Sequence, residues 1–329
     1  MKRILDYTIG ACDRDVTVLD FLREKGYSRH MLTGFKAFPE TLLLNGERPS
    51  GRTLLREGDL LRVALPQETS PEKILPVEMD LSILYEDEDC LVIDKPADTP
   101  VHPSQGNYEN TLANGVAWYY QSRGESCVFR CINRLDRDTT GVVLLAKNAL
   151  SASVLSSQMK QRQIRRTYLA LAEGITPERG IIDEPIARAA GSTILREVRP
   201  DGERAVTAFE RLAVSNGLSL LELHLATGRT HQIRVHMKHI GHPLIGDFLY
   251  YPEMSRIRRQ ALHSYRLEFR HPVTGAPLSF QAPIPEDFLN AFYPERRDRI
   301  PCRGSQARSA EERDRPPSSA ETEGDFSVC

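Results

Sequence analysis

A short polar segment, residues 133–141, holds the side chains of this chain best suited to chemistry. It reads NRLDRDTTG and runs directly into the apolar stretch VVLLA. Asp136 is therefore flanked by Arg134 and Arg137 at the start of a predicted buried strand. Burial raises the pKa of a carboxyl group and adjacent guanidinium groups lower it, so such an aspartate can stay ionised in a dry pocket. This carboxylate can serve as a nucleophile or base; the alternative is a charged turn with Asp136 in a surface ion pair.

A histidine-rich block and six cysteines raise the question of a metal site. The histidines are His231, His236, His239 and His242. No cysteine or carboxylate lies near them at ligand spacing, and the block lacks the HExxH pattern of hydrolytic zinc helices. Only one pair of cysteines is close in sequence, and no second pair follows at zinc-finger spacing. We therefore expect reduced thiols, no metal, and histidines that hydrogen-bond the backbone or face phosphates.

Five segments of the chain resemble, in the expected order, motifs of the RluA/RluD family of RNA pseudouridine synthases. The segment around Asp136 is similar to the HRLDxxTSG motif of that family. The other four are CLVIDKPADTPVHPSQG (90–106), RRTYLALAEG (165–174), LATGRTHQIRVHMKHIGHPLIGDFLY (225–250) and ALHSYRLEFRHPVTGAPLSFQAPIP (261–285). The resemblance covers about residues 80–290.

Three positions depart from the family pattern. Asn133 stands where His is common, and Thr140 stands where Ser is common. Both replacements keep hydrogen-bonding capacity. Asp98 replaces a usual Gly, and an aspartate tolerates positive φ better than most residues.

The resemblance also implies roles for individual residues. The catalytic aspartate of the family falls on Asp136, and its active-site tyrosine falls on Tyr168. One arginine of the 225–250 block is expected to pair with the carboxylate, with Arg234 as first choice and Arg229 as second. Arg134 is expected to approach the displaced base, because a planar guanidinium can stack on or pair with bases. Core packing for Tyr168 and a loop-fixing salt bridge for Arg134 remain alternatives.

The implied reaction breaks the bond between ribose and uracil, rotates the base, and joins its C5 to the sugar. Reactant and product contain the same atoms, so no cofactor, metal or energy source is expected. The target uridine must leave its stack to reach the carboxylate. Attack on the sugar, attack on the ring and proton abstraction all remain open for Asp136.

A basic stretch, residues 157–166 (SQMKQRQIRR), has four basic residues and no acidic one. Lys160, Arg165 and Arg166 are therefore candidate RNA contacts, together with His231 from the histidine-rich block. An ordinary solvated helix face is the alternative for this stretch.

Apolar runs of strand length recur between residues 81 and 272, and helical patterns are fewer. Strands are predicted over 81–87, 90–96, 141–148, 166–174, 205–214, 218–228 and 264–272, and helices over 111–123, 151–163 and 231–241. Without a regular βαβ alternation, this pattern favours an α+β fold with a largely antiparallel sheet. The resemblance adds that this is the pseudouridine synthase fold, with a mixed central sheet.

The first 66 residues predict a separate small domain. A helix over about residues 18–22 is broken at Gly26, Ser28 caps a second helix, and the runs LLLNG and GDLLRVAL read as strands. This order resembles an αL-type RNA-binding domain, although a two-helix domain with another purpose fits as well. We predict a linker over 67–78, a catalytic domain over 79–297 with its own hydrophobic cluster, and a disordered tail over 298–329.

The net charge of −2 does not by itself suggest a nucleic-acid partner. Residues 301–329 hold four Arg against six Asp or Glu and account for the whole deficit, and phosphate binding needs only a local basic surface. No stretch approaches the roughly 20 apolar residues of a membrane span. We expect a cytoplasmic, monomeric enzyme that modifies ribosomal or transfer RNA. A catalytically silent RNA-binding paralogue and a hydrolase using Asp136 are the competing hypotheses.

Overall fold

A nine-stranded sheet forms the body of the protein in the computed structural model, which describes residues 3–35, 38–66, 68, 74–104, 106–126 and 128–293. Its strand order is β4-β5-β6-β13-β7-β12-β11-β8, with β14 paired to β13. The strands are β4 (Ser82–Glu86), β5 (Cys90–Lys95), β6 (Thr140–Ala146), β7 (Arg165–Glu173), β8 (Arg179–Asp183), β11 (Val206–Ser215), β12 (Leu218–Leu225), β13 (Leu262–Arg270) and β14 (Pro277–Gln281). Its ladders are antiparallel except for the parallel pair β6–β13. The predicted α+β class with a mixed, largely antiparallel sheet is confirmed.

Both faces of the central strands are buried, because successive side chains of a strand point to opposite faces. Leu91, Ile93 and Val143 share one hydrophobic cluster with side chains of α3 (Leu112–Ser122) and α5 (Gln232–His239). Val92 and Leu144 share another with side chains of α4 (Ala149–Lys160). The remaining elements of this part are the short strands β9 (Ile186–Arg188) and β10 (Arg196–Val198) and the helix α6 (Glu286–Phe292).

The N-terminal residues form a three-stranded sheet of order β1-β3-β2 that is covered by two helices. The elements are β1 (Ile4–Thr8), α1 (Val18–Glu24), α2 (Arg29–Gly34), β2 (Leu42–Leu44) and β3 (Leu60–Ala64). Helix α1 ends before Gly26, and the Ser28 hydroxyl accepts from the amide of Met31 at the start of α2. Two helices and two of the strands were predicted here; β1 was not.

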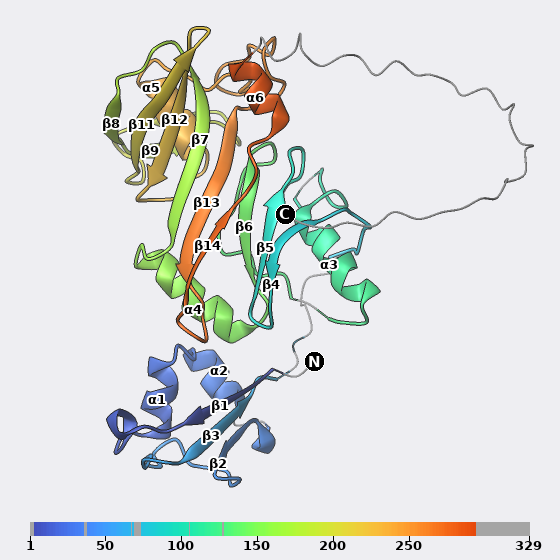
Figure 1. Ribbon diagram of the computed structural model, residues 1–329, viewed down its shortest axis with the longest axis vertical. Coiled ribbons are helices and arrows are strands. Elements are labelled where there is room, and N and C mark those ends of the chain that lie inside the picture. Colours follow the sequence, from blue (N-terminus) through green and yellow to red (C-terminus); the bar gives the residue numbers. More distant parts are fainter. Residues whose placement is uncertain are drawn as a thin grey trace, which may run out of the picture.

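The N-terminal elements pack against α4 at one end of the nine-stranded sheet (Figure 1). Leu150 of α4 belongs to the N-terminal hydrophobic cluster, and Val154 packs against it. Arg3 donates to the buried carboxylate of Asp89 at 2.7 Å, and Asp89 also accepts from Asn148, the N-cap residue of α4, at 2.8 Å. We expected the N-terminal segment and the catalytic domain to have separate hydrophobic clusters. Instead, the N-terminal cluster includes Leu150 of α4.

Gly26 tests this contact. Its φ is +92°, and a Cβ there would lie 2.5 Å from Cγ2 of Val154. Gly46 is a matched control, because its φ is +88° and a Cβ there would meet nothing within 4 Å. Both alanine variants carry the strain of positive φ. We expect Gly26→Ala to lower the free energy of unfolding by about 1–3 kcal/mol more than Gly46→Ala in urea titrations. Equal losses would show that the N-terminal elements do not pack on α4 in solution.

None of the helices in the described ranges is long and apolar enough to cross a membrane. The predicted tail, residues 298–329, and most of the predicted linker, residues 67–78, lie outside the described residues.

Candidate active site

The Asp136 loop, residues 133–139, leads into β6 and is held by buried groups from several directions. The ammonium of Lys95, at the end of β5, donates to the carbonyls of Pro96, Thr99 and Arg137 at 2.7–2.8 Å. Burial lowers the pKa of Lys95 to about 7, although Asp138 and Asp136 act in the opposite direction.

Two more side chains, Asn133 and Arg259, fix this loop. Asn133 is buried; its amide nitrogen donates to the carbonyl of Val142, and its oxygen accepts from the amide of Leu144. Arg259 donates to the carbonyl of Asp138 at 3.3 Å and forms a bidentate ion pair with Asp287 of α6. Asn133 therefore keeps the loop in place although it departs from the family pattern.

The Asp136 carboxylate forms an ion pair with Arg234 of α5. Arg234 Nη1 donates to Oδ2 of Asp136 at 2.8 Å, and its Nε and Nη2 grip both oxygens of Asp247 at 2.7 and 2.8 Å. The side chains of Arg234 and Asp247 are only 2% and 1% exposed. Burial opposes the charge of Arg234, but hydrogen bonding to Asp247 and the charge of Asp136 prevail and raise its pKa. The arginine is thus locked in its charged form.

This pairing decides between the two arginine candidates. Arg229 forms an ion pair with Glu203 and donates to the carbonyl of Arg204, so it does not contact Asp136. Of the two, Arg234 is the one that contacts Asp136.

One oxygen of Asp136 remains available. Oδ2 is taken by Arg234, whereas no residue of the described ranges donates a hydrogen bond to Oδ1. The side chain is 26% exposed and lines a cavity of about 880 Å³. Tyr168 of β7 lines the same cavity and is 5% exposed, and burial raises its pKa, so its hydroxyl stays protonated. The site therefore places an ionisable oxygen and an aromatic ring in one pocket that is large enough for a nucleotide.

His231 lines the cavity beside Asp136, and Tyr250 contacts His231. Nε2 of His231 lies 3.9 Å from Oδ2 of Asp136, and its Nδ1 is 2.9 Å from the hydroxyl of Tyr250. His231 adopts a left-handed conformation (φ 58°) as the N-cap of α5, a strained geometry often found at functional sites. Burial lowers the pKa of His231, and Arg234 adds to this against the opposing Asp136. A neutral imidazole therefore faces the carboxylate at neutral pH.

Asp247 and Tyr250 were not singled out from the sequence. A signal for Asp247 was present, because a carboxylate inside the apolar run PLIGDFLY needs a cationic partner if it is buried. Tyr250 offered no comparable signal, since a tyrosine in an apolar run is common in cores.

The predicted RNA contacts are only partly brought together. Arg134 is exposed at the cavity and makes no hydrogen bond or ion pair with any described residue. Lys160 at the end of α4 also lines the cavity, as does Arg166, which donates to the carbonyl of Thr227 at 3.3 Å. Arg165 does not line it, because neighbouring residues of a strand point to opposite faces.

The glycine position occupied by Asp98 does require positive φ, as the sequence suggested. Its φ is 53°, in the left-handed region that Asp reaches more easily than most residues. The family loop geometry is thus compatible with this replacement.

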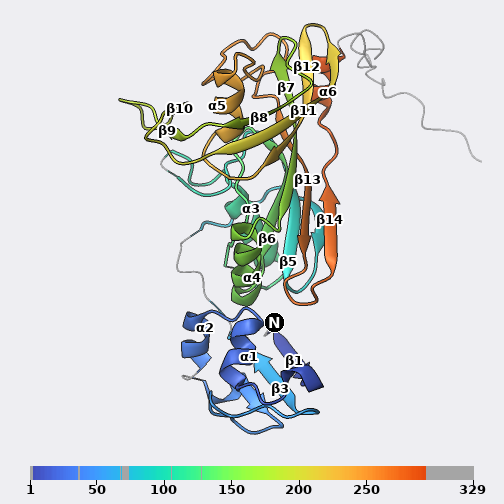
Figure 2. The same cartoon turned by 90° about the vertical axis from the view of Figure 1, so that its left-hand side faces the viewer.

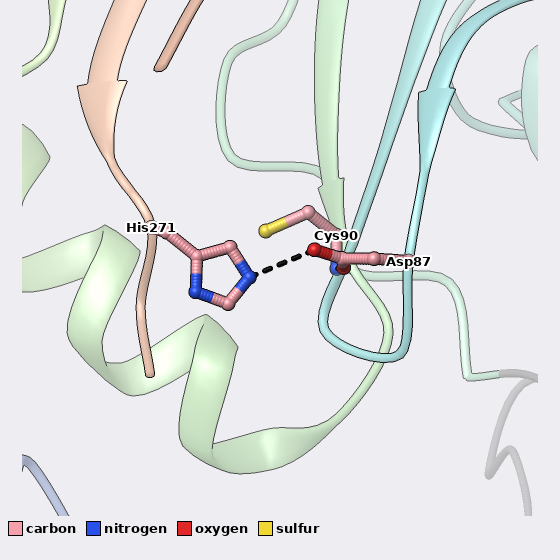
Figure 3. A group of neighbouring side chains, drawn as sticks. All are labelled: Asp87, Cys90 and His271. Carbon is pink, nitrogen blue, oxygen red and sulfur yellow. Dashed lines mark hydrogen bonds and ion pairs between the residues drawn. The ribbon is translucent and has the colours of Figure 1, made fainter. Parts of the chain in front are cut away.

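A second cluster of ligand-type side chains joins the β4–β5 turn to the β13–β14 turn (Figure 3). It consists of Asp87, Cys90 and His271. Oδ1 of Asp87 accepts from the amides of Asp89 and Cys90 at 2.8 and 2.7 Å. Its Oδ2 accepts from the hydroxyl of Tyr85 at 2.6 Å and from Nε2 of His271 at 2.8 Å. All four acceptor positions of the carboxylate are therefore used.

The hydrogen bonds of His271 do not fit a metal. Its Nδ1 accepts from the amides of Val273 and Thr274, so the ring proton lies on Nε2 and points at Asp87. A histidine that binds a metal through Nε2 normally donates Nδ1–H to an acceptor, and here two donors occupy that side. Burial also raises the pKa of the Cys90 thiol. The cluster joins the β4–β5 turn to the β13–β14 turn through hydrogen bonds.

The hydrogen bonds of Asp87 predict that this carboxylate makes a pH-dependent contribution to stability. Burial would raise the pKa of Asp87, but the hydrogen bonds from Tyr85, two amides and His271 outweigh it and lower the pKa. The contribution of this carboxylate is therefore complete above its unfolded pKa of about 3.9 and is lost as pH falls through the lower folded value. We expect Asp87→Asn to destabilise the protein at neutral pH and the gap to wild type to shrink below about pH 4.

Urea unfolding at a series of pH values measures this gap. Asp80→Asn is the matched control, because Asp80 is exposed and makes no hydrogen bond with a described residue. A gap that stays constant down to the acid limit would contradict the prediction.

Comparison with known proteins agrees with the resemblance found in the motifs. A family model described as RNA pseudouridylate synthase matches residues 89–239. The chain is 42% identical over 273 residues to "Uncharacterized RNA pseudouridine synthase YjbO" of Bacillus subtilis, covering 83% of this chain and 96% of that protein. It is 38% identical over 270 residues to "Ribosomal large subunit pseudouridine synthase D" of Xanthomonas campestris, covering 78% and 81%. The solved structure of "Human RNA Pseudouridylate Synthase Domain Containing 1" aligns with a TM-score of 0.52 and 27% identity, covering 65% of this chain and 86% of that one.

Proposed function

The chain belongs to the RluA family of RNA pseudouridine synthases, and on that premise we propose that it isomerises specific uridines of structured RNA with Asp136 as its catalytic carboxylate. As an isomerase it needs no second substrate. The observation that carries the assignment is the asymmetry of Asp136: Arg234 holds one oxygen, and the other accepts no hydrogen bond from a residue that the structure describes. The side chain lines the cavity.

The reaction explains why this asymmetry matters. The bond from C1′ to N1 breaks, a bond from C1′ to C5 forms, and one proton moves from C5 to N1, so atoms and charge balance. Attack at C1′, attack at the ring and abstraction of a proton each require one free, correctly placed carboxylate oxygen. The charged Arg234 keeps Asp136 ionised and oriented, because a guanidinium beside a carboxylate favours its anionic form.

Base flipping delivers the uridine to this oxygen. Arg134, exposed at the cavity and without a hydrogen bond or ion pair to any described residue, is suited to fill the gap left in the RNA stack or to pair with the base opposite. Tyr168 lies inside the cavity, where its ring can stack on the flipped uracil. Arg166 and Lys160 at the rim are suited to the flanking phosphates.

The substrate we propose is ribosomal or transfer RNA. Several relatives carry the name "Ribosomal large subunit pseudouridine synthase D", which favours ribosomal RNA for this chain. The test is incubation of the protein, without added metal or nucleotide, with RNA from a strain that lacks the gene, followed by carbodiimide mapping of pseudouridine. New modified positions that are absent in the untreated RNA support the function. RNA binding without a new pseudouridine would instead point to a catalytically silent paralogue.

We propose that residues 1–66 are a small RNA-binding domain ahead of a catalytic domain at 79–297. Its two helices and three strands support an αL-type module. Arg29, exposed at the start of α2, is one place to test it. We expect Arg29→Glu to weaken RNA binding and to reduce the salt dependence of the dissociation constant by about one phosphate contact. Binding curves identical to those of wild type over a range of salt would show that the start of α2 does not contact the RNA.

A further inference from the structure

The hairpin of β9 and β10 is set apart from the main sheet. The two strands form a sheet of their own and extend from the body of the protein next to α5 (Figure 2). They are antiparallel, with Ile186 opposite Val198 and Arg188 opposite Arg196. Two arginines thus sit directly across from each other near the free end of the hairpin.

The register also determines which way these arginines face. Residues two apart in a strand point to the same face, so Arg188 shares a face with Ile186, and Arg196 with Val198. Ile186 lies in a hydrophobic cluster with Tyr250, and Val198 packs against that cluster. The arginine pair is therefore on the side of the hairpin that faces the cluster around Tyr250.

Neither arginine has an acidic partner among the described residues, although like charges placed opposite each other in a sheet are destabilising. Their neighbours differ. Arg199 pairs with Asp201 at 2.8 Å, and Arg204 pairs with Asp183 at 3.0 Å. The two arginines on the inner face are thus the ones left uncompensated in and beside this hairpin.

A short chain of contacts connects the hairpin to the catalytic carboxylate. The amide of Arg196 donates to the hydroxyl of Tyr250 at 3.0 Å. Tyr250 in turn contacts Nδ1 of His231 at 2.9 Å, and Nε2 of His231 is 3.9 Å from Asp136. Lys238 of α5 places its ammonium 5.6 Å from the centre of the Tyr250 ring, and it too forms no ion pair with a described residue. Lys238 and the hairpin that carries Arg188 and Arg196 thus both meet Tyr250, and none of these three cations has an acidic partner among the described residues.

We propose that Arg188, Arg196 and Lys238 form a phosphate-binding shelf that holds the RNA backbone beside the flipped uridine. The proposal rests on the RNA substrate proposed above. A phosphate between Arg188 and Arg196 relieves their repulsion and accepts charge-assisted hydrogen bonds. The link through Tyr250 and His231 keeps the shelf at a fixed distance from Asp136, so a bound backbone sets the register of the RNA.

The test compares the double variant Arg188→Gln/Arg196→Gln with the control Arg199→Gln/Arg204→Gln, which removes two arginines that already have acidic partners. RNA affinity is measured by filter binding over a range of salt, and pseudouridine formation is measured at saturating RNA. We expect the shelf variant to bind RNA at least about tenfold more weakly at physiological salt. Its slope of log K against log[salt] should become shallower by about 1 to 2. Turnover at saturation should change little, and the control should bind like wild type.

A third variant, Arg188→Lys/Arg196→Lys, keeps both positive charges. It therefore distinguishes a loss of phosphate contacts from a disturbed hairpin. Its slope of log K against log[salt] should remain close to that of wild type. An unchanged slope in the glutamine variant, or an equal loss in the control, would overturn the shelf. If wild type itself forms no pseudouridine in the same assay, the proposed function fails instead, so the two failures are distinguishable.

Discussion

Replacing Asp136 by Asn is expected to reduce pseudouridine formation by at least about a thousandfold. The amide keeps the shape of the side chain but removes its charge and most of its basicity. No second carboxylate can take over, because Asp138 is paired with Arg137 and Asp247 is enclosed by Arg234. RNA binding should persist, since the basic residues at the cavity are untouched, and stability should change little because Arg234 keeps its bidentate partner.

Pseudouridine formation and filter binding on the same RNA measure these two properties. Asp98→Asn is a matched control: Asp98 is an exposed carboxylate that also lies near Arg137, and Asn accepts the same positive φ. The control should turn over at close to the wild-type rate. If Asp136→Asn still binds RNA and retains a tenth of wild-type turnover, Asp136 is not the catalytic group.

Replacing Arg234 by Met is expected to destabilise the protein by about 3–5 kcal/mol and to abolish turnover. Asp247 is fully buried, and removing one partner of a buried ion pair leaves an uncompensated charge. Adding Asp247→Asn should recover at least half of the lost stability. The buried charge is then gone, while the amide oxygen can still accept from the amides of Leu249 and Tyr250, as the carboxylate does now.

The double variant separates stability from catalysis. Urea titration should show the recovery, whereas turnover should stay low, because Asp136 has lost the guanidinium that orients it. Recovery of both stability and turnover would mean that Arg234 acts only as a core residue. No recovery of stability would mean that the buried charge of Asp247 is not the source of the loss.

Hydrophobic periodicity was sufficient to predict most of the central sheet. The runs that became β5, β6 and β7 contain nearly continuous apolar stretches, and β12 is rich in leucine; all four are bounded by turn residues. The Asp136 segment was recognisable because a polar cluster at the start of a buried strand is unusual without a function. Its similarity to a family motif then suggested the catalytic role that we propose for Asp136.

The elements that were missed are short or lack local signals. Strands β8 and β14 have five residues each, β9 and β10 have three, and α6 has seven residues with no side-chain hydrogen bond at its N-cap. Asp247 lies 13 residues beyond Arg234, and only the tertiary fold brings the two together. The contact between Gly26 and Val154 depends on two surfaces meeting, which periodicity within one segment cannot reveal.

The docking of the N-terminal elements on α4 limits which N-terminal segments of relatives could replace the one in this chain. Asp89 both receives Arg3 and supports the first turn of α4, while Leu150 fills the N-terminal cluster. A relative's N-terminal segment grafted at the linker would therefore meet a foreign surface. The natural unit of exchange is residues 3–66 together with the outward side of α4, so the first half of this helix should change in evolution with the segment that precedes it rather than with the sheet it covers.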